Sequence, residues 1–192
     1  MAYLILGLLL FLGVHSLRIV AEDWRNSTRA RLGEQPYKGL YSLVSIAGFA
    51  LLIWGYGQAR LAPQPLWATP KGMAHLAALL TLIAFVLLAA AYVPRNHLKA
   101  RLRHPMVLGI KTWALAHLLA NNTLADVLLF GSFLIWAALS FRAARQRDRA
   151  NPPAPIQATA AGTLLTLAIG IAAWAGFAFW AHGAWIGVRP FG

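Results

Sequence analysis

Long apolar runs separated by short basic segments constrain what this chain can fold into more than any other feature. They cover residues 2–17, 40–59, 73–93, 105–121, 124–141 and 157–182. A helix needs roughly 20 apolar residues to cross a hydrocarbon core of roughly 30 Å, so the shorter runs only just suffice. Hydrophobic residues make up 59% of the chain and charged residues only 11%, which leaves no polar stretch long enough for a separate soluble domain. The sequence predicts an all-α membrane bundle of six transmembrane helices, a single domain over residues 1–192.

The Lys and Arg residues alternate between dense and sparse segments along the chain. Segments 18–39, 94–104 and 142–149 together hold 13 of them, whereas the other two loops and the C-terminal tail hold 3. Because positive charge collects on the cytoplasmic side of a membrane, we expect the three basic segments in the cytoplasm and both termini in the periplasm. The net charge of +12 then faces anionic lipid headgroups, and no nucleic-acid partner is expected.

Histidines provide the candidate sites, because the chain has no cysteine. That composition excludes thiolate metal sites, iron–sulfur clusters and covalently attached c-type haem. His15 stands near the cytoplasmic end of the first run, in FLGVHSLR, and His117 lies deeper in its own run, in RHPMVLGIKTWALAHLLANN. An ionisable residue inside a membrane span indicates function. For each histidine, the alternative is a structural side chain bonded to a headgroup or to a backbone carbonyl.

Together the two histidines suggest haem. Two neutral imidazoles on different helices of a bundle, without a thiolate, suit an iron with two histidine ligands. Zinc would require a third or fourth ligand, and none is apparent at membrane depth. Depth counts against the pair, since His117 lies about 18 Å from the cytoplasmic end of its helix and His15 only about 8–10 Å from its own. A tilted helix or a deeper 94–104 loop would be needed to bring them level.

Three further residues are candidates for contact with a bound haem. Lys111 lies about one and a half turns to the cytoplasmic side of His117, and Arg18 lies one turn beyond His15. Both cations are placed to meet haem propionates, although a lysine within a span also commonly snorkels to lipid phosphate. Trp113 shares the helical face of His117 and completes the set.

Other polar residues near the apolar runs have simpler explanations. Thr123 and Asp126 form the Thr-x-x-Asp pattern of a capping box, so Asp126 is assigned no chemistry. His104 lies about 140° around the helix from His117, so it is not expected to share a ligand with it. His75 and His182 stand near the outer ends of their runs, where polar groups are ordinary, and the sequence assigns them no role.

Two stretches resemble the NnrU family: RHPMVLGIKTWALAHLLANN with the VLLFG that follows it, and FLGVHSLR with the downstream GEQPYKGLYSLVS. The resemblance covers nearly the whole chain. It implies a bacterial inner-membrane protein linked to denitrification and nitric oxide metabolism. The family includes the plant 15-cis-zeta-carotene isomerase, which isomerises a carotenoid double bond with haem b. By this resemblance, the two haem-ligating histidines of that enzyme correspond to His15 and His117.

The chain departs from related patterns at several positions. Ala114 stands where the isomerase has a cysteine, three residues before the second ligand, so a ligand switch using that thiol is absent. Asn122 and Thr123 replace the residues of the LANGD turn found in many NnrU sequences. The RHPxxxG element also resembles isoprenylcysteine methyltransferases, but FRAARQRDR follows here instead of their paired glutamates. Binding of S-adenosylmethionine is therefore not expected.

The sequence leaves three functional hypotheses open. The first is a haem b membrane protein that acts as a redox or gas-responsive factor, with a nitrogen oxide as its ligand. The second is a haem-dependent cis–trans isomerase of a hydrophobic, carotenoid-like polyene that enters from the bilayer. The third is a membrane assembly factor without a cofactor. Membrane lipid is the expected partner in all three, and a homo-oligomer is compatible with the sequence.

Overall fold

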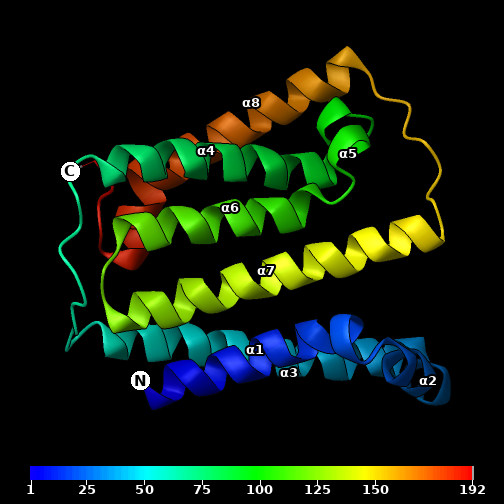
Figure 1. Cartoon of the computed structure of the whole chain (residues 1–192), viewed down its shortest axis with the longest axis horizontal. Helices are drawn as coiled ribbons and strands as arrows, with labels where there is room; N and C mark the ends of the chain where they lie inside the picture. The colour runs from blue at the N-terminus through cyan, green and yellow to red at the C-terminus, as the bar shows by residue number, and fades with distance from the viewer. Residues whose placement is uncertain (192) are drawn as a thin grey trace.

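The computed structural model describes residues 1–191, and its ordered elements are helices (Figure 1). Five helical segments are long and apolar enough to cross a membrane. They are α1 (Ala2–Val20), α3 (Glu34–Ala59), α4 (Met73–Tyr92), α7 (Leu124–Ala150), and α8 (Ala160–Gly176) continued by the π-helix η1 (Phe177–Ile186). A sixth apolar helix, α6 (Pro105–Ala120), has only 16 residues. The prediction of an all-helical membrane protein is confirmed.

All three basic segments contain helix beyond what the apolar runs indicate. Residues 22–32 form a polar helix, α2 (Glu22–Leu32), with Glu22 and Asp23 in its first turn and Arg29 and Arg31 in its last. Acidic groups near the positive N-terminus of a helix and basic groups near its negative C-terminus stabilise it. Helix α7 continues past its apolar part to Ala150, because Arg, Ala and Gln are favourable helix residues. A short helix, α5 (His97–Leu102), interrupts the 94–104 segment.

The helices pack as two groups that meet along α7 (Figure 1). Helices α1 and α3 form one extensive pair, and α4 packs on both α6 and α8 in the other group. Helix α7 contacts α1 on one side and α6 on the other. The α1–α3 pair is close because Gly7 lies against the backbone of Leu52 and Gly55 against the backbone of Leu4. Small residues allow this approach between membrane helices.

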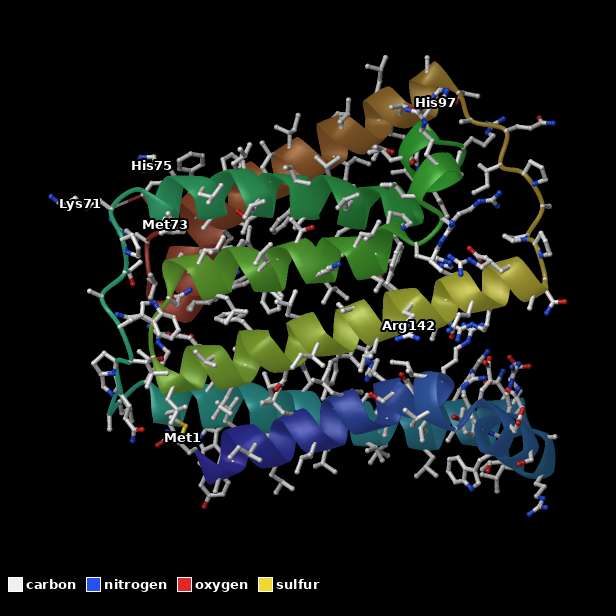
Figure 2. All side chains as sticks on the ribbon, viewed as in Figure 1. Met1, Lys71, Met73, His75, His97 and Arg142 are labelled. Carbon is white, nitrogen blue, oxygen red and sulfur yellow. The ribbon has the colours of Figure 1, made fainter. Side chains whose placement is uncertain are left out.

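The bundle has a basic end and an opposite end. Helices α2 and α5 and the arginine-rich end of α7 lie at the basic end, and both chain termini lie at the opposite end (Figure 1). Figure 2 shows the same separation, with Met1, Lys71 and His75 far from His97. The three segments that the charge pattern assigns to one side of a membrane therefore lie at one end of the molecule.

Backbone and side-chain hydrogen bonds tie the opposite end together. The 60–72 loop runs along the α6–α7 turn, where the Leu66 N–H donates to the Asn122 carbonyl over 2.8 Å and the Leu124 N–H to the Gln64 carbonyl over 2.9 Å. The predicted capping box is present: the Thr123 hydroxyl accepts from the backbone N–H of Asp126, whose carboxylate accepts from the backbone N–H of Thr123. The Tyr56 hydroxyl also donates to Asp126, over 2.6 Å, and joins α3 to α7.

Candidate functional site

Both candidate histidines are held in the same way by their own helices. The His15 Nδ1–H donates to the Phe11 carbonyl over 2.6 Å, and the His117 Nδ1–H donates to the Trp113 carbonyl over 2.9 Å. The tautomer follows from the partner, because a carbonyl oxygen can only accept a hydrogen bond. In the neutral form of each imidazole, the lone pair is then on Nε2. An Nδ1–H bond of this kind orients metal-ligating histidines, and it is also the backbone-carbonyl bond expected of a structural histidine.

His15 lies where α1, α3 and α7 meet. Its ring centroid is 4.3 Å from that of Phe11, 5.4 Å from that of Tyr41 on α3 and 6.2 Å from that of Trp136 on α7. The indole Nε1–H of Trp136 is buried and makes no hydrogen bond. A buried donor without an acceptor costs free energy, so the surroundings of His15 favour an additional polar group there.

His117 lies between α6 and α7, nearer the opposite end. Its ring stacks on Phe130 at a centroid distance of 4.5 Å and an interplanar angle of 27°. Trp113, one turn earlier on α6, lies 5.1 Å from both the His117 and the Phe130 rings. The backbone carbonyl of His117 accepts a bond from the Asn121 side-chain amide over 2.8 Å. Aromatic packing therefore fixes the imidazole on one face, and the Nδ1–H bond fixes its direction.

Three aromatic side chains, which we call the aromatic wedge, connect the two histidines through a series of ring contacts: Phe11, Phe133 and Trp113. Phe133 of α7 lies 5.9 Å from Phe11 and 5.6 Å from Trp113, centroid to centroid. Along α7, His15 contacts Trp136 and His117 contacts Phe130, and these residues are about 9 Å apart on the helix axis. The depth difference found by counting residues is thus present in the packed bundle.

Two imidazole donors fit haem, but α1 and α6, which carry the two histidines, do not contact each other and both pack on α7. Metal–imidazole bonds are about 2 Å long, so two ligands on opposite sides of one iron have nitrogens about 4 Å apart. For both rings to reach one iron, the packing of α1 and α6 on α7 and the side chains of the aromatic wedge would have to rearrange. Within residues 1–191 no group of three or more His, Cys, Asp or Glu is placed to hold a metal ion.

The three accessory candidates occupy different surroundings. Arg18 lies at the basic end and pairs with Glu22 over 3.5 Å. Lys111 is exposed on α6 and makes no hydrogen bond or ion pair with the residues that the structure describes. Trp113 belongs to the aromatic wedge and packs against the apolar core. Of the three, only Trp113 therefore contacts a candidate ligand directly, namely His117.

The remaining histidines have local partners. His104 caps the start of α6, and its Nε2 lies 2.9 Å from the Asp148 carboxylate of α7. His97 bonds the Thr163 hydroxyl of α8 over 2.7 Å, and the His182 Nδ1–H donates to the Val188 carbonyl over 2.6 Å. His75 lies at the opposite end of the bundle (Figure 2).

Sequence reasoning missed the contribution of α7. Phe130, Phe133 and Trp136 follow one another at intervals of three residues, and all three contact rings of the candidate site. The signal was available, because residues three apart lie on one helix face. It indicates only a face, however, and does not say which helices that face meets.

The comparisons with known proteins give one match. The model of a family described as NnrU protein matches residues 3–190. No curated protein and no solved structure gives a significant match. Because the family model spans nearly the whole chain, including both histidine stretches, the chain belongs to the NnrU family.

Proposed function

We propose that this protein binds haem b in the bacterial inner membrane, with His15 and His117 as axial ligands, and acts in nitric oxide or other nitrogen-oxide metabolism. One observation carries the proposal: two imidazoles, on two helices that both pack against α7, each donate through Nδ1–H to a carbonyl of their own helix, which leaves Nε2 as the metal-binding nitrogen of the neutral ring. Haem would supply an iron centre able to carry one electron or bind a small gas.

The directions of the two side chains support a shared ligand. Side chains on an α-helix lean toward its N-terminus. Helices α1 and α6 run in opposite directions in the bundle (Figure 1), so along the bundle axis their side chains lean in opposite senses, which reduces the depth difference between His15 and His117. In the proposal, the aromatic wedge turns aside and flanks the porphyrin with flat apolar surfaces, and Arg18 and Lys111 are the partners of its propionates.

The membrane arrangement in this proposal has six spans, with α6 as the shortest. Its 16 residues extend over about 24 Å, less than the roughly 30 Å of a hydrocarbon core. Helices α4 and α7 pack along its sides. The basic end faces the cytoplasm and both termini face the periplasm, as the positive-inside rule requires.

The test compares the visible spectra of detergent-purified wild type, His15→Ala, His117→Ala and His104→Ala. We expect low-spin, six-coordinate haem in the wild type and largely high-spin haem in either single ligand variant. The double variant should bind no haem. His104→Ala is the matched control, because its imidazole pairs with Asp148 away from the site, and its spectrum should equal that of the wild type.

Two outcomes would contradict the proposal. Absence of a Soret band after haem is supplied would leave a membrane assembly factor without a cofactor. High-spin haem in His104→Ala together with a normal spectrum in His117→Ala would transfer the ligand role to His104.

A second candidate function is supported by a groove beside His15. It has a volume of about 280 Å³, lies between α1 and α7, and is lined mostly by apolar side chains, with Trp136 at its wall. Trp136 also contacts His15, so an apolar chain in this groove would lie close to that imidazole. Such a groove suits a polyene substrate of a haem-dependent isomerase. Chromatography of carotenoid isomers from cells that produce a cis polyene, with and without the protein, decides this candidate.

A further inference from the structure

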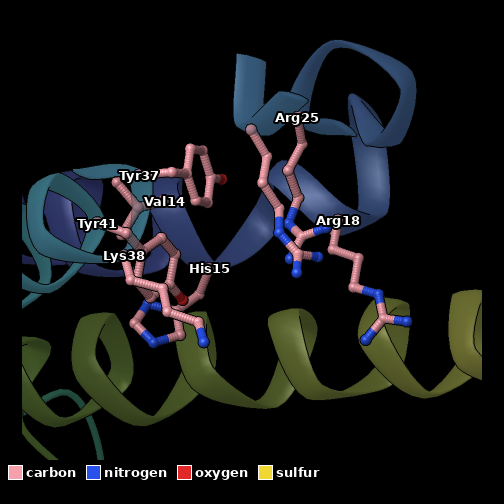
Figure 3. Close-up of a pocket in the computed structure, with 8 residues that line it drawn as sticks. Val14, His15, Arg18, Arg25, Tyr37, Lys38 and Tyr41 are labelled. Atoms are coloured by element: carbon pink, nitrogen blue, oxygen red, sulfur yellow. The ribbon is translucent and has the colours of Figure 1, made fainter. Parts of the chain in front are cut away.

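A cavity at the basic end lies outside the proposed haem-binding pair, although His15 and Arg18 contribute to its wall. It has a volume of about 390 Å³ and is lined by residues of α1, α2 and α3 (Figure 3). Four of the lining residues are cations, namely Arg18, Arg25, Arg29 and Lys38, and none is acidic. The cavity therefore presents converging positive groups from three helices.

The carboxylates near the cavity do not balance this charge. Glu34 is shared between Arg29 and Lys38, at 3.0 and 2.7 Å. Glu22 is shared between Arg18 and Arg147, at 3.5 and 3.7 Å. Two carboxylates thus serve four cations, and among the described residues Arg25 has no ion-pair partner and lies with its guanidinium 5.9 Å from the centre of the Tyr37 ring. The cavity therefore carries a net positive charge.

A buried hydroxyl provides an independent sign of a ligand. Tyr37 lines the cavity and is only 8% exposed, yet its hydroxyl makes no hydrogen bond. In Figure 3 that hydroxyl points toward the arginine side chains of α2. A buried hydroxyl without a partner is costly, and an anion bound between it and Arg25 would accept a hydrogen bond from it.

The position of the cavity along the apolar helices indicates which anion could reach it. Its residues lie where the apolar part of α1 ends and that of α3 begins, and α2 with its exposed Trp24 runs across the same end. Lipid phosphates lie at this level of a membrane, and interfacial tryptophans mark it. We propose that the cavity binds the phosphate of an anionic phospholipid from the cytoplasmic leaflet, held by Arg25, Arg29 and the Tyr37 hydroxyl. Guanidinium groups bind phosphate oxygens in pairs, which suits two arginines one helical turn apart.

The experiment counts lipids on the full-length protein by native mass spectrometry after reconstitution with equal amounts of phosphatidylglycerol and phosphatidylethanolamine. We expect retention of one phosphatidylglycerol per protein. Arg25→Gln should weaken this retention about fivefold, because a charge-assisted hydrogen bond to the bound phosphate is lost. The matched control is Arg31→Gln, which removes the same charge from α2 at a position that does not line the cavity, and it should retain the lipid.

A second variant separates ligand binding from folding. Tyr37→Phe keeps the ring over which Arg25 lies and removes only the unpaired hydroxyl. In vesicles of phosphatidylcholine alone, its thermal stability should equal or exceed that of the wild type, because a buried unpaired group is lost. In phosphatidylglycerol vesicles the wild type should gain stability and Tyr37→Phe should gain less. Equal gains for both proteins would overturn the role of the hydroxyl.

The last part of the test asks whether the cavity binds a soluble phosphate instead of a phospholipid. If inorganic phosphate at millimolar concentration displaces the retained phosphatidylglycerol and stabilises the wild type in phosphatidylcholine, the site takes a soluble phosphate and the lipid assignment is wrong. Equal retention of both lipids also overturns it. Either result leaves the haem proposal untouched, because that proposal is read from the Soret region in His15 and His117 variants.

Discussion

Lys111 illustrates how much the surroundings of one residue decide its role. It lies within α6, in the sequence stretch that contains His117, yet it is exposed and makes no hydrogen bond or ion pair with the residues described. An ammonium group at such a position either extends along the helix to lipid phosphate or neutralises an anion bound to the protein. Only the second role requires a bound haem, whose propionate would be the anion.

We predict that Lys111→Met weakens haem retention about threefold and leaves the ligand-sensitive part of the spectrum unchanged, because one partly solvated ion pair contributes only a small free energy. Titration of purified protein with haem measures the change. Lys71→Met is the control, since Lys71 lies in the exposed loop at the opposite end (Figure 2). Equal haem affinity in all three proteins would assign Lys111 to lipid contact.

For single residues, the sequence predicts which side chains are candidates for the site better than it predicts how those side chains pack against one another. The Nδ1–H bonds of His15 and His117 depend only on helical geometry four residues back, and the difference in their depths follows from counting residues. The aromatic wedge was not predictable, because Phe133 enters it from α7 and its position depends on how three helices pack. The Tyr37 hydroxyl was missed for the same reason.

The pairing of α1 with α3 shows that the sequence also does not tell how whole helices pack against each other. Gly7 and Gly55 lie where the backbone of one helix meets the other, and a Cβ atom at either position would collide with that backbone. Gly57, on the same helix as Gly55, has no atom within 4 Å of the place a Cβ would occupy. Two glycines two residues apart therefore have different structural roles.

We predict that Gly55→Ala lowers the free energy of unfolding by about 1–3 kcal/mol, because α1 and α3 must move apart. Gly57→Ala should be neutral or slightly stabilising, since alanine favours a helix and meets nothing. Thermal unfolding of the two variants in the same detergent measures the difference. Equal melting temperatures would mean that the close approach of the two helices is not needed for stability.

Apolar runs located the membrane helices well, but not every helix of the fold. The runs at 73–93 and 105–121 agree closely with α4 and α6. Helix α2 and the last turns of α7 are polar, so they are stabilised by capping charge and helix propensity instead of burial. The spacing of apolar residues does not distinguish the π-helix η1 from α8, so the sequence did not predict it. The two helix types differ in which backbone carbonyl accepts the hydrogen bond of each N–H.

In the whole molecule, α2, α5 and the end of α7 lie at one end (Figure 1). This arrangement predicts how the protein is oriented in the membrane. A fluorescent protein fused after Arg149 should be fluorescent in the cytoplasm, and alkaline phosphatase fused after Gly192, which lies outside the described residues, should be active in the periplasm. The reason is the division of basic residues, 13 against 3. If both reporters are found in one compartment, α8 with η1 does not cross the membrane.

The position of α7 between the two helix groups has a consequence for how the protein is made. Leu4 and Leu8 of α1 share a core with Ala125 and Leu129 of α7, which the ribosome reaches only after α4 and α6 have been synthesised. Until then these side chains of the nascent chain contact lipid, which costs little for apolar groups already inserted in a bilayer. The unfinished chain therefore consists of two separate helical hairpins, α1–α3 and α4–α6, and insertion of α7 is the step of biogenesis that joins them.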